Sequence, residues 1–211
     1  MTQGSHAEAA PSVRLLIADD ETLFRQALAT LLDLRDDLSV VAQAASGPEA
    51  VAMGRAHTPD VALLDLQMPG ADGIETAIAL REHADIGCVI VTSHGRPGHL
   101  RRALEAGVRG FLPKTSSAEH LAEAVHTVHR GGRYVDPRLA ADAIAAGASP
   151  LSAREADVLE LSLAGAGIDE IARRVSLSVG TVRNYLSNAV GKLGAANRHD
   201  ACAIARRMGW I

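Results

Sequence analysis

The sequence has few aromatic residues and only two cysteines. Phe, Trp and Tyr together make up 2% of its 211 residues, so Leu, Val, Ile and Ala must build its hydrophobic cores. So few aromatic faces argue against a protein that stacks on flavin rings or on single-stranded bases. The two cysteines, Cys88 and Cys202, lie far apart and have no metal-ligand spacing around them. We expect both to be buried, reduced thiols.

Long hydrophobic runs are also absent. No apolar run reaches the roughly 18 residues that a transmembrane helix needs. Residues 1–10 are small and polar, without the basic start and apolar core of a signal peptide. The sequence therefore predicts a cytoplasmic protein with no membrane partner and with a disordered N-terminus over residues 1–12.

Charge is distributed unevenly along the chain. The formal net charge is −4, but the part from Ser149 onward carries eight Lys or Arg against six Asp or Glu. That part is about +2 and the remainder about −6. Between Arg173 and Lys192 every charged residue is basic. This placement favours a nucleic-acid partner more than the small excess itself does.

The first 130 residues alternate short apolar runs with helical patterns. Strands are predicted at 13–18, 38–42, 61–64, 88–92 and 110–112. Helices are predicted at 21–34, 48–57, 73–82, 98–106 and 118–130. Five consecutive β/α units favour an α/β fold with a five-stranded, doubly wound parallel sheet. In such a sheet, functional residues gather at the carboxyl ends of the strands.

The rest of the chain predicts a linker and a second, smaller domain. Residues 131–150 contain Gly-Gly, Asp-Pro and Ser-Pro steps and predict a linker, with a helical stretch at about 138–146. Residues 151–211 predict an all-α domain of four helices. Ser152 and Glu155 have the spacing of a capping box at the start of the first of these helices.

Five polar residues fall at strand ends of the predicted sheet. Asp19 and Asp20 follow the first strand, Asp65 the third, Thr92 ends the fourth and Lys114 follows the fifth. Three converging carboxylates repel one another, and a divalent cation such as Mg²⁺ relieves that repulsion. The hydroxyl and the ammonium could hold the oxygens of a phosphoryl group on Asp65. Taken singly, these residues could be a helix cap and ordinary surface groups; together, in order, they favour a site.

The sequence LDLQMPG at residues 64–70, with Asp-Gly at 72–73, resembles the phospho-acceptor loop of receiver domains. The resemblance covers residues 13–130 and implies a flavodoxin-like fold with Asp65 as the phospho-acceptor. It implies Mg²⁺ ligation by Asp20, Asp65 and the backbone carbonyl of Gln67, with Asp19 acting partly through water. Thr92 and Lys114 would bind the phosphoryl oxygens.

The same resemblance assigns further roles and shows two departures. Phe111 stands where the family keeps its rotameric switch aromatic, although a strand Phe is more often core. Gln67 and His94 flank the path of attacking water and are expected to influence the lifetime of the aspartyl phosphate. Thr115 follows Lys114 where many receivers carry proline. The segment 93–98 is rich in Gly and Pro, which predicts a mobile loop.

The second domain contains a helix-turn-helix candidate at residues 168–193. Spacing alone leaves an ordinary helical bundle equally open. The stretches LSARE (151–155), IDEIA (168–172) and LSVGTVRNYLS (177–187) resemble LuxR-type DNA-binding domains. Tyr185 stands where histidine is common. In this reading the helix 179–193 enters the DNA major groove, and its contact candidates are Thr181, Arg183, Asn184, Ser187 and Lys192.

Together the two parts resemble a NarL/FixJ-family response regulator. The resemblance implies a sensor histidine kinase as phosphodonor, a homodimer when phosphorylated and an inverted-repeat operator in double-stranded DNA, with RNA polymerase as a further candidate partner. No independent enzyme activity is expected. One alternative is a phosphohydrolase with an aspartyl nucleophile, but Gln67 occupies the place of its second Asp. A flavin-binding domain is disfavoured because Asp19, Asp20 and Glu21 would repel phosphate. A DNA-binding regulator that works without phosphorylation stays open.

Overall fold

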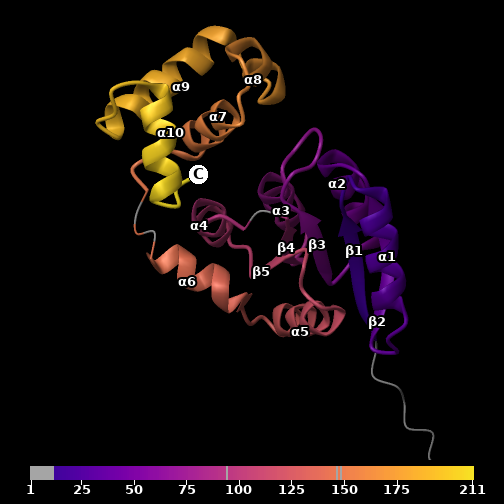
Figure 1. Ribbon diagram of the computed structural model, residues 1–211. Coiled ribbons are helices and arrows are strands. Elements are labelled where there is room, and N and C mark those ends of the chain that lie inside the picture. The colour runs from indigo at the N-terminus through magenta and orange to yellow at the C-terminus, as the bar shows by residue number, and fades with distance from the viewer. Residues whose placement is uncertain (1–11, 94, 146, 148) are drawn as a thin grey trace, which may run out of the picture. The chain divides into compact units, whose positions relative to one another are not determined.

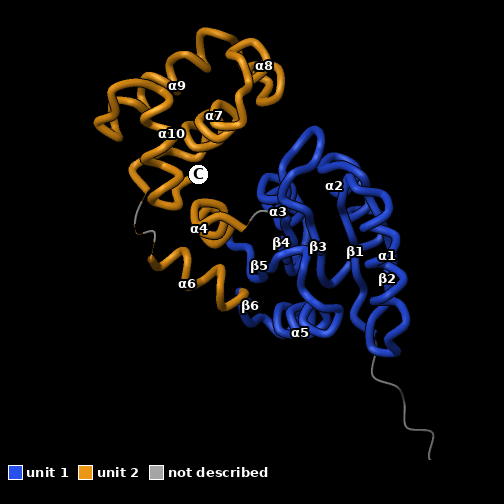
Figure 2. Tube along the Cα trace, in the orientation of Figure 1, with its two compact units in different colours: residues 1–93, 106–135 blue, residues 94–105, 136–211 orange. Residues whose placement is uncertain are grey.

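The computed structural model describes residues 12–93, 95–145, 147 and 149–211. The chain divides into two compact units (Figure 2). One comprises Met1–Ser93 and Ala106–Val135, and the other comprises His94–Glu105 and Asp136–Ile211. The disorder predicted for residues 1–12 falls almost wholly outside the described residues. No helix in the described ranges is long and apolar enough to cross a membrane.

The first unit is built on a parallel sheet of strand order β2-β1-β3-β4-β5-β6 (Figures 1 and 2). Its strands are β1 (Val13–Ala18), β2 (Leu38–Ala44), β3 (Val61–Asp65), β4 (Gly87–Thr92), β5 (Gly110–Pro113) and β6 (Tyr134–Val135). The predicted doubly wound parallel sheet is confirmed, with one strand more than the five expected. The added strand, β6, lies in the segment predicted as linker. It is two residues long, too short for any periodicity, and is placed by the Tyr134 amide, which donates to the Arg109 carbonyl.

Helices cover both faces of this sheet. They are α1 (Thr22–Asp33), α2 (Gly47–His57), α3 (Gly73–Arg81) and α5 (Ala118–His129). Helices α1 and α5 contact each other on one face, and α2 and α3 contact each other on the other. The near-continuous apolar strands β3 and β4 are buried along their whole length, as a sheet covered on both faces requires.

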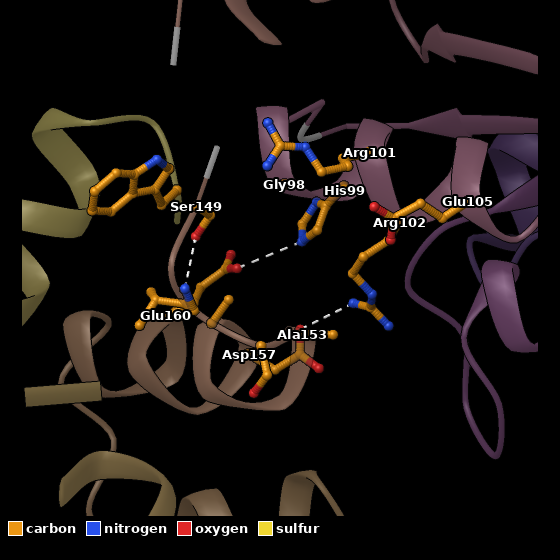
Figure 3. Close-up of a pocket in the computed structure, with 13 residues that line it drawn as sticks. Gly98, His99, Arg101, Arg102, Glu105, Ser149, Ala153, Asp157 and Glu160 are labelled. Carbon is orange, nitrogen blue, oxygen red and sulfur yellow. Dashed lines mark hydrogen bonds and ion pairs between the residues drawn. The ribbon is translucent and has the colours of Figure 1, made fainter. Parts of the chain in front are cut away.

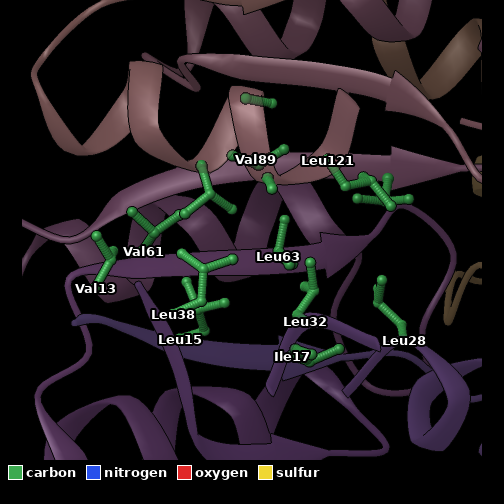
Figure 4. Packing of buried hydrophobic residues seen from close by; sticks show 14 of the residues in the cluster. Val13, Leu15, Ile17, Leu28, Leu32, Leu38, Val61, Leu63, Val89 and Leu121 are labelled. Carbon is green, nitrogen blue, oxygen red and sulfur yellow. The ribbon is translucent and has the colours of Figure 1, made fainter. Parts of the chain in front are cut away.

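Aliphatic side chains fill the space between the sheet and the α1/α5 layer (Figure 4). Alternate residues of β1, Leu15 and Ile17, face the same way and join Leu63 of β3 in this core. Helix α1 contributes Leu28 and Leu32 at helical spacing. This core holds the strands in register, and therefore fixes where their carboxyl ends lie.

The second unit is entirely helical. It contains α4 (Pro97–Glu105), α6 (Pro137–Ala145), α7 (Ala153–Leu163), α8 (Ile168–Arg174), α9 (Val179–Lys192) and α10 (Arg198–Arg207). Helices α7 to α10 are the four helices predicted for the C-terminal domain, and they pack around Leu159, Ile171 and Val182. Helix α6 lies where a helical stretch was expected, although Ala146 is outside the described residues.

Helix α4 carries basic residues that meet acidic residues of α7 within this unit (Figure 3). Arg102 pairs with Asp157 at 3.2 Å, and His99 Nε2 lies 3.8 Å from Glu160 Oε2. Arg96 also pairs with Glu160. These contacts attach α4 and the residue before it to α7.

The turn between α8 and α9 has the form of a helix-turn-helix. Ser178 caps α9 by accepting a hydrogen bond from the Thr181 amide at 3.1 Å. Ser176 lies in the left-handed region with φ of 54°, which is uncommon for a residue with a Cβ atom. The Leu177 amide donates to the Ala172 carbonyl and closes the turn. The sequence thus specifies both the start of α9 and the turn that precedes it.

Candidate functional site

Three carboxylates meet at the carboxyl edge of the parallel sheet. Asp19 directly follows β1, and Asp65 is the last residue of β3. Both are buried, with exposed fractions of 2% and 6%, whereas the neighbouring Asp20 is exposed. One oxygen from each of the three lies within 4.8 Å of the others. The structure therefore brings together the three acidic residues that the sequence placed at strand ends.

Lys114, which follows β5, provides the positive charge nearest to these carboxylates. Its Nζ lies 2.8 Å from Asp19 Oδ2, 2.7 Å from Glu21 Oε1 and 3.6 Å from Asp65 Oδ1. The ammonium also lies 4.8 Å from the centroid of the Phe24 ring. Burial disfavours its charge, but hydrogen bonds to Asp19 and Glu21 more than offset this, and the pKa of Lys114 is raised.

Two of these neighbours, Glu21 and Phe24, were not among the predicted site residues. Glu21 was considered only as a charge that repels phosphate, and Phe24 only as part of a helix. Glu21 directly follows the Asp19-Asp20 pair in the sequence, and this adjacency is the signal that could have identified it. The ring of Phe24 gives no comparable signal, because helix residues of this kind are usually core.

The surroundings of Asp65 disfavour its negative charge. Burial raises its pKa to about 6, and the nearby charge of Asp19 acts in the same direction, while Lys114 opposes them. The Gln67 amide donates to Asp65 Oδ2 at 3.3 Å. A further cation that approached this carboxylate would stabilise its ionised form. Oxygen donors of this kind are the ligands that Mg²⁺ prefers.

The backbone places Thr92 and Lys114 side by side. Thr92 ends β4, lies opposite Pro113 in the register and is buried. The Lys114 amide donates to the Thr92 carbonyl at 2.8 Å. Phe111 lies in the same strand as Pro113, opposite Ile90, and is 1% exposed. The switch role of Phe111 stays a prediction, and His94 lies outside the described residues.

The loop after Asp65 is held tightly against the start of α3. The Gly73 amide donates to the Leu66 carbonyl at 3.0 Å. Asp72 and Glu75 form a capping box, with bonds of 2.7 Å and 3.1 Å. A Cβ atom on Gly73 would lie 2.2 Å from the carbonyl oxygen of Asp65, so only glycine fits. This packing fixes the backbone on which Asp65 is presented.

Helix α9 presents a polar face opposite a buried stripe. Val182, Leu186 and Ala189 are buried in the helical core. Three of the predicted DNA contacts, Arg183, Asn184 and Ser187, are exposed on the other side. Thr181 is only partly exposed, and its hydroxyl lies 2.8 Å from that of the capping Ser178. The structure thus presents the three exposed residues as one surface, with Thr181 bound to the cap.

Lys192 has a partner that the sequence did not reveal. Its ammonium donates to Glu155 Oε2 at 2.7 Å, and Glu155 is 4% exposed. Burial raises the pKa of Glu155, but Lys192 and Ser152 more than reverse this, and the pKa is lowered overall. The predicted phosphate contact of Lys192 stays a prediction, and its side chain is 42% exposed.

Comparisons with known proteins match both halves of this arrangement. Residues 15–126 match the family "Response regulator receiver domain", and residues 149–205 match "Bacterial regulatory proteins, luxR family". The transcriptional regulatory protein DesR of Bacillus subtilis is 40% identical over 94% of this chain and 99% of its own length. The response regulator RamR of Streptomyces coelicolor is 43% identical over 94% of this chain and 98% of its own.

A solved structure shows the same likeness in three dimensions. The crystal structure of the response regulator ChrA, from a haem-sensing two-component system, is 32% identical in sequence. It covers 96% of this chain and 100% of its own, with a TM-score of 0.58. The likeness therefore spans both units of the chain.

Proposed function

Since this chain belongs to the response regulators that join a receiver domain to a LuxR-type DNA-binding domain, we propose that Asp65 is its phospho-acceptor and α9 its DNA-reading helix. Proteins of this family are transcription regulators of two-component systems rather than enzymes. The observation that carries the assignment is the meeting of Asp19, Asp20 and Asp65 beside Lys114. Because the proposed target is DNA, we propose that the protein acts in the cytoplasm.

Asp19, Asp20, Asp65 and the backbone carbonyl of Gln67 would hold the Mg²⁺. The donor chemistry fits, because three carboxylates within 4.8 Å carry more negative charge than the one ammonium of Lys114 neutralises. Bound there, the cation would neutralise part of the charge that builds up on a phosphoryl group in transfer. The cation would also favour the ionised, nucleophilic form of Asp65.

In the proposed reaction, a carboxylate oxygen of Asp65 attacks the phosphorus of a phosphohistidine on a sensor kinase. The bond between phosphorus and the histidine nitrogen breaks, and the histidine keeps the electron pair and takes a proton from solvent. Lys114 and the hydroxyl of Thr92 would hold the oxygens of the transferred group. The backbones of the two residues are adjacent, since the Lys114 amide donates to the Thr92 carbonyl, which supports this role.

Phosphorylation would act on DNA binding through a shift of populations. The phosphoryl group carries nearly two negative charges and replaces the single charge of the Asp65 carboxylate. Thr92 would move toward them and Phe111 would fill the space behind, which would favour a homodimer. A shift in the ratio of active to inactive protein from 1:99 to 99:1 takes about 5.5 kcal/mol of differential stabilisation.

The dimer would read an inverted repeat through two copies of α9. Half-sites would lie one helical turn apart or less. Arg183 and Asn184 are the proposed base readers, since Arg pairs bidentately with guanine and Asn with adenine. Ser187 faces the same surface, and Lys192 would meet phosphate in addition to Glu155. RNA polymerase is a further proposed partner at the promoter.

Intact mass spectrometry tests the site assignment. The protein is incubated with acetyl phosphate and Mg²⁺, and the wild type should gain the mass of one phosphoryl group. Asp65→Asn should gain none, because the amide is nearly isosteric but is not a nucleophile. Omission of Mg²⁺ should prevent the gain in the wild type. A phosphorylated Asp65→Asn protein would refute the assignment.

A further inference from the structure

The ammonium of Lys114 is engaged away from the proposed phospho-acceptor. Its two short contacts are to Asp19 at 2.8 Å and to Glu21 at 2.7 Å. Asp65 Oδ1 lies at 3.6 Å, beyond hydrogen-bond distance. A lysine ammonium has three donors, so these two carboxylates take most of what it can offer. One donor remains, so a phosphoryl group that drew the ammonium fully toward Asp65 would have to displace Asp19 or Glu21.

Glu21 is the partner that can be given up. Asp19 is 2% exposed and also accepts a bond of 2.8 Å from the Glu21 amide, so it is built into the sheet edge. The Glu21 side chain is 63% exposed. It makes no cap bond to α1, although Glu21 stands at the N-cap position. Its backbone is fixed while its carboxylate remains available to Lys114.

Stability does not explain this ion pair. An exposed carboxylate gains little from a partner lysine, because water screens the attraction. Glu21 does, however, add a negative charge at the mouth of a site that already holds three. An incoming phosphodonor is an anion and meets this charge as repulsion.

We propose that Glu21 is a positioning residue that retains Lys114 and so slows the phosphorylation of Asp65. The inference rests on the proposed function, because it takes Asp65 as the phospho-acceptor. Phosphorylation exchanges the Glu21 carboxylate for a phosphoryl oxygen at the ammonium. Glu21 therefore sets how readily the unphosphorylated protein responds to a donor.

The test compares initial rates of phosphorylation by acetyl phosphate at saturating Mg²⁺, followed by intact mass. Glu21→Gln should be phosphorylated roughly three- to tenfold faster than the wild type, the effect of one unit charge a few ångströms away near a protein surface. Glu82→Gln, an exposed acid at the end of α3, removes the same charge and should leave the rate unchanged. An unchanged or slower rate for Glu21→Gln overturns the proposal.

Two further variants separate action through Lys114 from simple repulsion. Glu21→Asp keeps the charge but shortens the reach to Lys114, so it should also be faster than the wild type. In a Lys114→Met background, Glu21→Gln should accelerate the reaction clearly less than it does with Lys114 present, since coupled groups lose their shared effect when the partner is gone. A Glu21→Asp protein as slow as the wild type overturns the role of Lys114, even where the Lys114→Met rates are too low to follow. The same acceleration in both backgrounds also overturns it.

The controls keep this inference apart from the proposed function. A wild-type protein that gains no phosphoryl group contradicts the proposed function itself. If phosphorylation requires Asp65 but the wild type and Glu21→Gln react at the same rate, only the role of Glu21 is overturned. Thermal unfolding with increasing Mg²⁺ should show similar metal responses in wild type and Glu21→Gln, because Glu21 acts on Lys114 rather than on the cation.

Discussion

Lys192, the last residue of α9, donates a hydrogen bond of 2.7 Å to Glu155 in the first turn of α7. Glu155 also accepts a bond of 2.7 Å from the Ser152 amide and is buried. The pair therefore joins the proposed DNA-reading helix to the capping box that starts the domain. Lys192 therefore links α9 to α7, in addition to any contact that it makes with phosphate.

Lys192→Met should lower the free energy of unfolding of the helical domain by about 1–3 kcal/mol, because it leaves a buried carboxylate without its cation. Urea unfolding followed by circular dichroism measures this. Arg183→Ala, on the exposed face of the same helix, should change stability by less than about 0.5 kcal/mol. Equal stabilities of Lys192→Met and wild type would show that the ion pair contributes nothing.

The effect of Lys192→Met should depend on pH. The pKa of Glu155 in the folded protein lies below its ordinary value of 4.5. A depressed carboxyl pKa contributes stability above the unfolded-state pKa, and this contribution is lost as the pH falls through the folded-state value. The difference between wild type and Lys192→Met should therefore be full at neutral pH and shrink as the pH falls below the ordinary pKa of 4.5. A difference that grows on acidification would contradict this.

Asp65→Asn should stabilise the metal-free protein at neutral pH by about 1–2 kcal/mol. Burial and Asp19 raise the pKa of Asp65 to about 6, above its ordinary 3.8, so the ionised group destabilises the folded state once the pH exceeds that range. Thermal unfolding in the presence of a chelator measures the gain. Mg²⁺ should then raise the melting temperature of the wild type more than that of Asp65→Asn. Asp85→Asn, an exposed acid, serves as the control and should be neutral.

Ser176→Gly should raise the stability of the helical domain by about 0.5–1 kcal/mol. Ser176 has φ of 54°, where a Cβ atom crowds the backbone and glycine does not. The same change at Ser187, inside α9, should lower stability by about 0.5 kcal/mol, because glycine is a poor helix former. Chemical unfolding of both variants gives the two signs. A loss of stability in Ser176→Gly would show that its side chain supports the turn.

Arg183→Ala should relax base preference at one position in each half-site and weaken binding by about 1–3 kcal/mol. Sites selected from a random DNA library by wild type and variant reveal this. Arg173→Ala, an exposed cation on α8, should keep the wild-type preference. If Arg183→Ala keeps that preference too and loses only affinity, Arg183 contacts phosphate instead of a base.

Regular patterns predicted most of the fold. Strands buried on both faces and helices with an apolar stripe leave periodic signals, so the order of β1 to β5 and of α7 to α10 could be predicted. β6 could not, because two residues have no period and its placement depends on the edge of β5. Unequal burial at the acidic edge, with Asp19 covered and Asp20 exposed, likewise depends on the packed sheet.

The acidic site was predictable for a related reason. Strand ends of a parallel sheet share one edge, so Asp19, Asp65 and Lys114 could be expected to converge. Contacts made by long, flexible side chains leave no such pattern. The hydrogen bonds from Lys114 to Glu21 and from Lys192 to Glu155 join residues 93 and 37 positions apart, and only the folded structure reveals them.

DNA binding measured with and without phosphorylation tests the central claim most directly. Wild type and Asp65→Asn are incubated with acetyl phosphate and Mg²⁺, and their size and their affinity for a DNA site selected with the wild-type protein are recorded. Phosphorylated wild type should dimerise and bind at least about tenfold more tightly than the untreated protein, while Asp65→Asn should be unaffected by the donor. Equal DNA affinity for both proteins with and without the donor, despite a phosphoryl group on the wild type, would contradict this claim. It would indicate a regulator that works without phosphorylation.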